Sequence, residues 1–210
     1  MTGQQRKENS EQIFAQQGVT PLKDNLPPME EEAEIEIKSG QEIARRVLVL
    51  SYLNCVALQP ELRDHIVRFL SEESLWNMAT EKERLIFSQE TLSDEDHDYV
   101  AWRNESIWVM LWVLNKFDVL DFPVEPVDAT EIIKLIPPFF DDTDAFVSTA
   151  ETRSKTDILQ QADLYFRLCW AVRESERDNS TRLRFDAGVA FERHFAMEWI
   201  KNIRFEWEDD

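Results

Sequence analysis

Hydrophobic residues recur every three or four positions over long stretches of the chain, which is the period of an α-helix. The strongest pattern begins after Ser39, which together with Glu42 has the Ser-x-x-Glu form of a capping box. The turns that follow, to about Leu58, are apolar on nearly every side. Because a helix without a polar face must be covered all round, we predict a central helix here.

Capping residues mark the starts of further helices. The predicted starts are Thr80, which repeats the capping box with Glu83, Ser93 for a helix through Leu114, Ser154 for a long helix to about Glu176, and Asp186 for the last helix, to about Lys201. The first turn after Ser93 is rich in acids (Asp94, Glu95, Asp96 and Asp98), which the exposed backbone N–H groups of a helix start favour. Shorter helices are predicted at about 60–70, at 72–79, and from Asp128 to the prolines at 137–138.

The N-terminal residues have a different pattern. A short helix is predicted at about 8–17, with Gly18 as its C-terminal stop. Residues 20–39 hold three prolines and a run of glutamates, so we expect an extended arm, with one short strand at 33–38 where Ile35 and Ile37 alternate with Glu. The domain division that follows is 1–38 for the helix and arm, 39–203 for a single helical domain, and 204–210 for a frayed acidic tail.

Composition supports a helical fold. Only 4 Gly and 8 Pro occur in 210 residues, too few for an all-β fold of many short hairpins. We therefore predict an all-α, compact multi-helix bundle of about seven to nine helices, two or three of them long and central, with the extended arm and at most one strand. Most of the 7 Trp lie in helical apolar patterns and are expected in the core, and Cys55 and Cys169 are expected to be buried free thiols.

Charge excludes several partners and suggests another. The formal net charge is −19, which disfavours binding to nucleic-acid backbones and to anionic membrane surfaces. Residues 91–152 carry 14 acids and 3 bases, so this stretch alone contributes −11. Part of that charge is explained by helix capping, and the rest favours an encounter with a basic protein.

The sequence lacks the common catalytic signatures. It has no glycine-rich phosphate loop, no H-E-x-x-H, no C-x-x-C and no G-x-S-x-G. The acids at 94–98 lack the Gly and the distal Glu of a calcium loop, and His194 with Glu198 is better explained by a structural hydrogen bond or ion pair than by a metal. We therefore predict no cofactor and no metal. The apolar runs are also too short to span a bilayer, so a cytoplasmic location is expected.

Arg103 is the most unusual polar residue. It falls on the same helical arc as Val100, Ile107 and Met110, and a buried charge needs a partner carboxylate. The candidate partners are Asp163, Glu192 and Glu198. We expect a polar cluster where three helices meet, formed by Arg103, Glu105, Asp163, Arg167, Glu192, Arg193 and His194. Two interpretations stay open: an ion network that specifies the fold, or a pocket with acid, base and cation within reach of one another.

Four segments carry a family resemblance: SGQEIARR at 39–46, WRNESIW at 102–108 and on to Trp112, ILQQADLYFRLCWA at 158–171 and VAFERHFAMEW at 189–199. Together with an arm like residues 12–28, they resemble the bacterial proteins grouped as domain of unknown function 4272. The resemblance implies a bacterial, cytosolic, helical protein without an assigned activity, and it transfers no catalytic residue. Position 169 is Cys here and more often His in that family, which weakens a metal site.

Two functions remain open at this point. The first is a non-catalytic protein that acts through protein–protein interaction with a basic partner, for example by neutralising a basic toxin or nuclease or by mimicking the charge of nucleic acid. The alternative is a hydrolase-like enzyme that uses the Arg/Glu/Asp/His cluster. A homo-oligomer is compatible with both.

Overall fold

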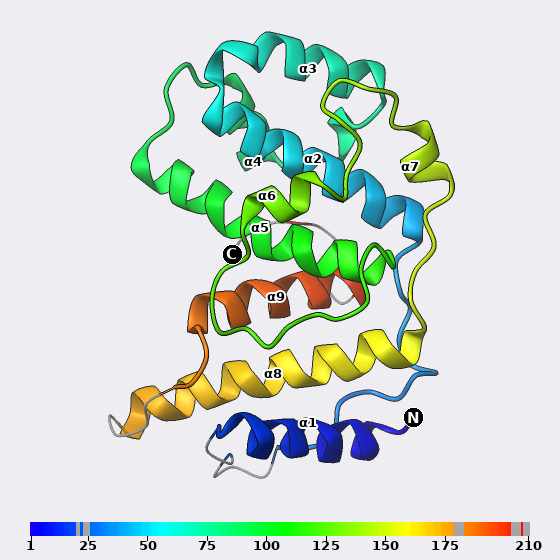
Figure 1. The fold of residues 1–210 in the computed structure, drawn as a ribbon, viewed down its shortest axis with the longest axis vertical. Helices are drawn as coiled ribbons and strands as arrows, with labels where there is room; N and C mark the ends of the chain where they lie inside the picture. Colours follow the sequence, from blue (N-terminus) through cyan, green and yellow to red (C-terminus); the bar gives the residue numbers. More distant parts are fainter. Residues whose placement is uncertain (20–21, 23–25, 179–182, 203–206, 208–210) are drawn as a thin grey trace. The chain divides into compact units, whose positions relative to one another are not determined.

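The structure is a computed structural model in which residues 1–19, 22, 26–178, 183–202 and 207 are described. Over these residues the chain forms nine α-helices and two short 3₁₀ helices, and it contains no strand (Figure 1). The α-helices are α1 (Gly3–Gln17), α2 (Gly40–Leu58), α3 (Arg63–Glu72), α4 (Glu81–Ser88), α5 (Asp94–Val113), α6 (Ala129–Ile133), α7 (Asp144–Ser148), α8 (Lys155–Asp178) and α9 (Ala187–Ile200). The 3₁₀ helices are η1 (Pro60–Leu62) and η2 (Trp76–Met78). The all-α prediction is confirmed.

Capping boxes fix the starts of four helices. The predicted boxes at Ser39 and Thr80 are present, and Ser93 forms a third with Asp96. A fourth box joins Thr2 to Gln5, so α1 begins at Gly3 rather than near residue 8. The predicted C-terminal stop is correct: Gly18 has a φ of 66°, a left-handed conformation that costs glycine little.

One expectation about local structure is wrong, and one helix was not expected. The strand at 33–38 does not form, because these residues have no neighbouring strand to pair with and their stretch of chain is bound through its carbonyls to side chains instead. Helix α7 was not predicted, since it has only five residues and no side-chain cap. The expected frayed tail lies outside the described residues except at Trp207, which is only 4% exposed.

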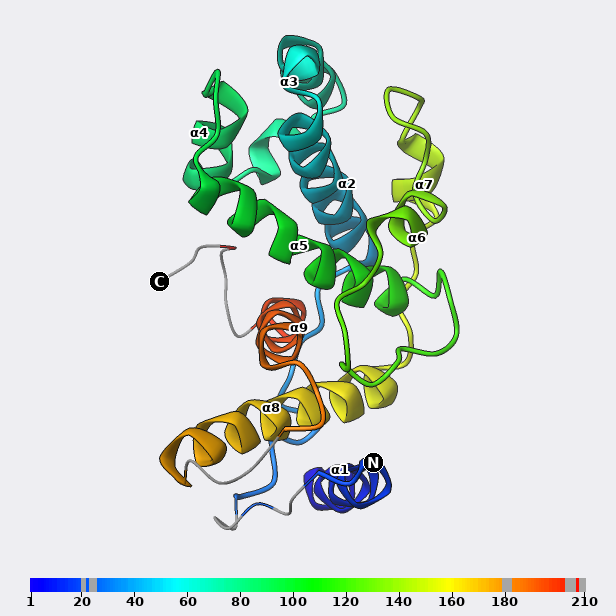
Figure 2. The ribbon, with the colours of Figure 1, turned by 60° about the vertical axis from the view of Figure 1, so that its left-hand side comes forward.

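The chain divides into two compact units. Unit 1 comprises Met1–Ile37, Leu120–Pro126 and Arg153–Phe205, and unit 2 comprises Lys38–Val119, Val127–Thr152 and Glu206–Asp210. In unit 1, α8 lies between α1 and α9 (Figures 1 and 2). The predicted boundary after residue 38 falls beside the change from one unit to the other, and the domain assignment itself stays a prediction.

Unit 2 is built around α2. Val47, Val49, Leu50 and Leu53 of this helix are fully buried, as predicted for a helix without a polar face. Helices α3, α4, α5 and α7 all pack against it, and α3 also contacts α4. The tryptophans are less uniformly buried than expected. Trp112, Trp199 and Trp207 are buried, whereas Trp102 is exposed and the others, including Trp76, are half-buried.

Candidate functional site

A buried ion pair attaches α4 to α2 in unit 2. Both guanidinium Nη atoms of Arg46 bind the carboxylate of Glu83, with Nη1 to Oε2 at 2.8 Å, and Nη1 also donates to the carbonyl of Met78 at 2.8 Å. Both residues have an exposure of 0%. Glu83 in addition accepts the backbone N–H of Thr80, so one carboxylate caps α4 and binds it to α2. The ring of Trp207 lies 4.4 Å from the guanidinium carbon of Arg46.

This attachment sets which face of α4 is accessible. Residues four apart share a helix face, so Phe87 is buried on the side of Glu83, whereas Arg84 and Ser88 form a second stripe. The same spacing places Arg63, Val67 and Ser71 in one row along α3, with Asp64 and Arg68 in the next row.

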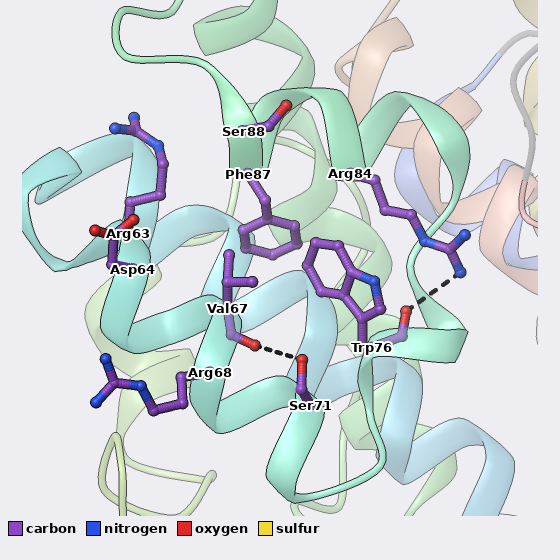
Figure 3. Close-up of a pocket in the computed structure, with 9 residues that line it drawn as sticks. All are labelled: Arg63, Asp64, Val67, Arg68, Ser71, Trp76, Arg84, Phe87 and Ser88. Carbon is purple, nitrogen blue, oxygen red and sulfur yellow. Dashed lines mark hydrogen bonds between the residues drawn. The ribbon is translucent and has the colours of Figure 1, made fainter.

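These stripes, together with Trp76 of η2, line a groove with a volume of about 590 Å³ (Figure 3). We call it the arginine groove; its lining residues are Arg63, Asp64, Val67, Arg68 and Ser71 of α3, Trp76 of η2, and Arg84, Phe87 and Ser88 of α4. The rings of Trp76 and Phe87 are 5.7 Å apart at 50° to each other. Figure 3 shows Arg63, Asp64 and Arg68 on one side of this aromatic pair and Arg84 on the other.

The polar groups of the arginine groove are only partly satisfied. Nη2 of Arg84 donates to the carbonyl of Trp76 at 3.4 Å. The Nε atoms of Arg63 and Arg84 and Nη2 of Arg63 are shielded from solvent and have no acceptor within the described part of the chain. Shielded donors without acceptors cost free energy. The three arginines that line the groove outnumber its single carboxylate, Asp64, and this excess of positive charge favours an anionic ligand. The sequence analysis missed this groove, because it is formed by residues of α3, η2 and α4 that are brought together only by folding and form no local motif.

The residues of the predicted polar cluster belong to two different units. Asp163, Arg167, Glu192, Arg193 and His194 belong to unit 1, whereas Arg103 and Glu105 belong to unit 2. The structure brings together Asp163 and Arg167, one helical turn apart on α8. Nε of Arg167 donates to Oδ2 of Asp163 at 2.8 Å, and Nη2 donates to Oδ1 at 3.0 Å. The hydroxyl of Ser10 donates to the same carboxylate at 2.6 Å, so α1 contributes to this buried network.

The other members of unit 1 have separate surroundings. Arg193 is buried, and its Nη1 donates to the carbonyl of Asp121 at 2.7 Å and to the Tyr165 hydroxyl at 3.3 Å. Nδ1 of His194 lies 4.0 Å from Oε1 of Glu198, one turn later on α9, and Oε1 of Glu198 also lies 2.7 Å from the ammonium of Lys201. Glu192 is half-buried beside Arg193 in the sequence.

In unit 2, Arg103 is buried as predicted, with an exposure of 5%. Its guanidinium carbon lies 4.2 Å from the centre of the Tyr99 ring, one turn earlier on α5. Glu105 is also buried and accepts the backbone N–H of Val127 at 2.5 Å, which joins α5 to the segment before α6. Among the proposed partner carboxylates, Asp163 is bound by Arg167 and Ser10, and Glu198 by Lys201.

The arm of unit 1 is bound through its backbone. Four cationic side chains of α1 and α8 donate to carbonyl groups between residues 26 and 35. Lys7 donates to Leu26 at 2.7 Å, Arg167 to Pro27 at 3.2 Å, Arg6 to Glu30, and Lys155 to Glu32 at 2.7 Å and to Ile35. Gly3 lies so close to the arm that an added Cβ would be 2.3 Å from the carbonyl oxygen of Met29. The arm also borders a second groove, of about 410 Å³, with Phe166 and three glutamates in its wall.

The cysteines are free and buried, as predicted. Burial raises the pKa of the Cys169 thiol to about 12 and also raises that of Cys55, so both are protonated near neutral pH. Within the described ranges, no group of three or more His, Cys, Asp or Glu side chains is placed to hold a metal ion. Over the same ranges, no helix combines the length and hydrophobicity needed to cross a membrane.

A family model described as "Domain of unknown function (DUF4272)" matches residues 6–210. The chain belongs to the DUF4272 family. The match covers both units and the arm, and it confirms the resemblance seen in the four sequence segments. The DUF4272 description assigns no activity. No curated protein and no solved structure matches the chain.

Proposed function

We propose that this DUF4272 protein acts through protein–protein interaction, and that the surface of residues 91–152 meets a basic partner. The observation that carries the proposal is exposure: 12 of the 14 acidic side chains in this segment are exposed, and ten of those 12 belong to unit 2. The two exceptions are Glu105, which is buried, and Asp96, which is half-buried in the Ser93 capping box.

The bases of the same segment compensate little of this charge. Arg103 is buried and Lys116 is half-buried. Lys134 is exposed, but it is paired with Glu131 at 2.6 Å. An exposed surface of one sign steers an oppositely charged protein and raises its association rate, most strongly at low ionic strength. A basic nuclease or toxin, which the chain would neutralise, is a partner with the required charge.

The hydrolase-like alternative gains no support from a specific observation. Its central carboxylate, Asp163, is neutralised by Arg167 and bound by Ser10. This pairing is the arrangement expected of a structural ion network.

The test is a pull-down with the tagged full-length protein at low salt and at about 0.5 M salt, followed by binding measurements with each purified captured protein. We expect basic proteins to be captured at low salt and released at high salt. The proposal fails if nothing basic is enriched, or if high salt leaves the complex intact.

A pair of matched variants separates this surface from net charge. The test variant carries Asp118→Asn, Asp141→Asn and Glu151→Gln, all exposed and within residues 91–152. The control carries Glu61→Gln, Glu72→Gln and Glu90→Gln, which are exposed residues of the same unit outside that segment. Each variant removes three charges. We expect a lower association rate for the test variant only; an equal loss in both would mean that net charge, not this surface, attracts the partner.

A further inference from the structure

The arginine groove is an exception to the charge of the chain. In a protein with a net charge of −19, three guanidinium groups and one carboxylate line this groove, which gives it a formal charge of +2. A basic partner of the acidic surface would be repelled here. The groove therefore calls for an occupant of the opposite charge, and the guanidinium groups that line it are the donors for such an occupant.

The floor of the groove suits a flat ring. Trp76 is half-buried, so part of its indole is accessible, and the buried Phe87 supports it at 5.7 Å. A ring that stacks on Trp76 would gain the favourable contact that aromatic side chains give to heterocycles. The volume of about 590 Å³ is within the range typical of small-molecule sites.

The two hydroxyl groups add a directional feature. The Ser71 hydroxyl donates its proton to the carbonyl of Val67 at 2.7 Å, and the Ser88 hydroxyl donates to the carbonyl of Leu85 at 2.8 Å. Because each proton is used within the hydroxyl's own helix, each oxygen presents only acceptor lone pairs to the groove. These oxygens fit a ligand that carries N–H or O–H donors as well as a negative charge.

We infer that the arginine groove binds a phosphorylated heterocycle of mononucleotide size, whose ring stacks on Trp76 and whose phosphate is bound by Arg63, while Arg68 adds positive charge on the same side of the groove. A phosphate dianion matches the groove charge of +2. One guanidinium group can donate two parallel hydrogen bonds to the oxygens of a phosphate. Arg84 faces the heterocycle, because its guanidinium is already attached to the carbonyl of Trp76. Asp64 lies between Arg63 and Arg68 in sequence and on the same side of the aromatic pair, where it weakens phosphate binding by repulsion.

The experiment is calorimetric titration of the full-length protein at low salt with adenosine 5′-monophosphate and uridine 5′-monophosphate. Adenosine and inorganic phosphate are titrated separately. We expect at least one monophosphate to bind more tightly than either fragment, and to weaken as salt is added. Absence of saturable binding of both monophosphates below about 1 mM would overturn the inference.

Four variants assign the contacts. Arg63→Met is expected to weaken monophosphate binding about tenfold and to leave adenosine binding unchanged, because it removes charge-assisted hydrogen bonds to phosphate only. Trp76→Leu is expected to weaken both ligands. Asp64→Asn is expected to tighten monophosphate binding roughly threefold by removing a repulsive charge. Arg45→Met is the matched control, since Arg45 is a half-buried arginine of the same unit outside the groove.

Thermal unfolding of each variant checks that the fold is kept. Asp64 is exposed, so the gain expected from Asp64→Asn does not depend on a variant that could lose its fold. The inference is wrong if Arg63→Met binds the monophosphate as well as Arg45→Met does, or if Asp64→Asn weakens binding.

Discussion

Single residues of this protein place charge in the interior in different ways. Asp163 and Arg167 neutralise each other on one helix, whereas Arg193 is held by a carbonyl and a tyrosine hydroxyl. Arg103 packs over the ring of Tyr99. The burial of Arg103 could be predicted from helical period alone. Its surroundings could not, because they depend on which side chains of other turns and helices lie opposite it.

Removing one partner of the Asp163–Arg167 pair leaves an uncompensated charge in the interior. We expect Asp163→Ala to lower the free energy of unfolding by about 3–5 kcal/mol, measured by urea denaturation. Glu131→Ala is the control: it breaks the exposed pair with Lys134 and should change stability by less than about 1 kcal/mol. A loss for Asp163→Ala no larger than that of the control would contradict a structural role for the buried pair.

At the scale of elements, the sequence predicted most of the α-helices because their signals are local. Ser39, Thr80 and Asp186 each occupy the predicted cap. The start of α1 was missed although Thr2 and Gln5 have the Thr-x-x-Gln form of a capping box, so the signal was available. The arginine groove could not be predicted in this way. It requires α3 and α4 to pack side by side, and α4 is attached to α2 by a contact between Arg46 and Glu83, which are 37 residues apart in sequence.

Two glutamates at the same position of a capping box allow a comparison of how much a buried and an exposed carboxylate contribute to stability. Glu83 and Glu42 both occupy the third position of a capping box, but Glu83 is buried against Arg46, whereas Glu42 is exposed. We expect Glu83→Gln to cost about 3–5 kcal/mol, because it leaves the charge of Arg46 unpaired, and Glu42→Gln to cost about 1 kcal/mol or less. Thermal and urea unfolding measure both changes; similar losses for the two variants would rule out a special role for the buried carboxylate.

For the whole molecule, the free energy of unfolding at acidic pH depends on carboxylates that cap helices in different parts of the chain. Hydrogen bonds from Ser39 lower the pKa of Glu42, and hydrogen bonds from Ser93 lower that of Asp96, from ordinary values of 4.5 and 3.8. At these two carboxylates, the folded state therefore binds protons less readily than the unfolded state does. The stabilisation from these carboxylates is complete above the unfolded pKa values and is lost as pH falls through the lowered ones.

We accordingly expect the urea midpoint to fall between about pH 5 and pH 3, and the Asp96→Asn variant to show a shallower fall over the same range. Protonation also reduces the repulsion within a chain of charge −19, which acts in the opposite direction. The comparison of the variant with the parent protein isolates the contribution of the cap. An identical pH profile for both would show that this cap does not set the acid limit.

The carbonyl groups that attach the arm have a consequence for how freely its sequence can change. A backbone carbonyl is the same in every amino acid. The hydrogen bonds that attach the arm therefore end on a part of the chain that substitution does not alter, and they come from Arg6, Lys7, Lys155 and Arg167. The exposed side chains of the arm that the structure leaves outside these contacts, such as Ala33 and Glu36, can therefore be exchanged while the path of the arm is kept. Relatives that keep the four cations can each display a different set of arm side chains on the same scaffold.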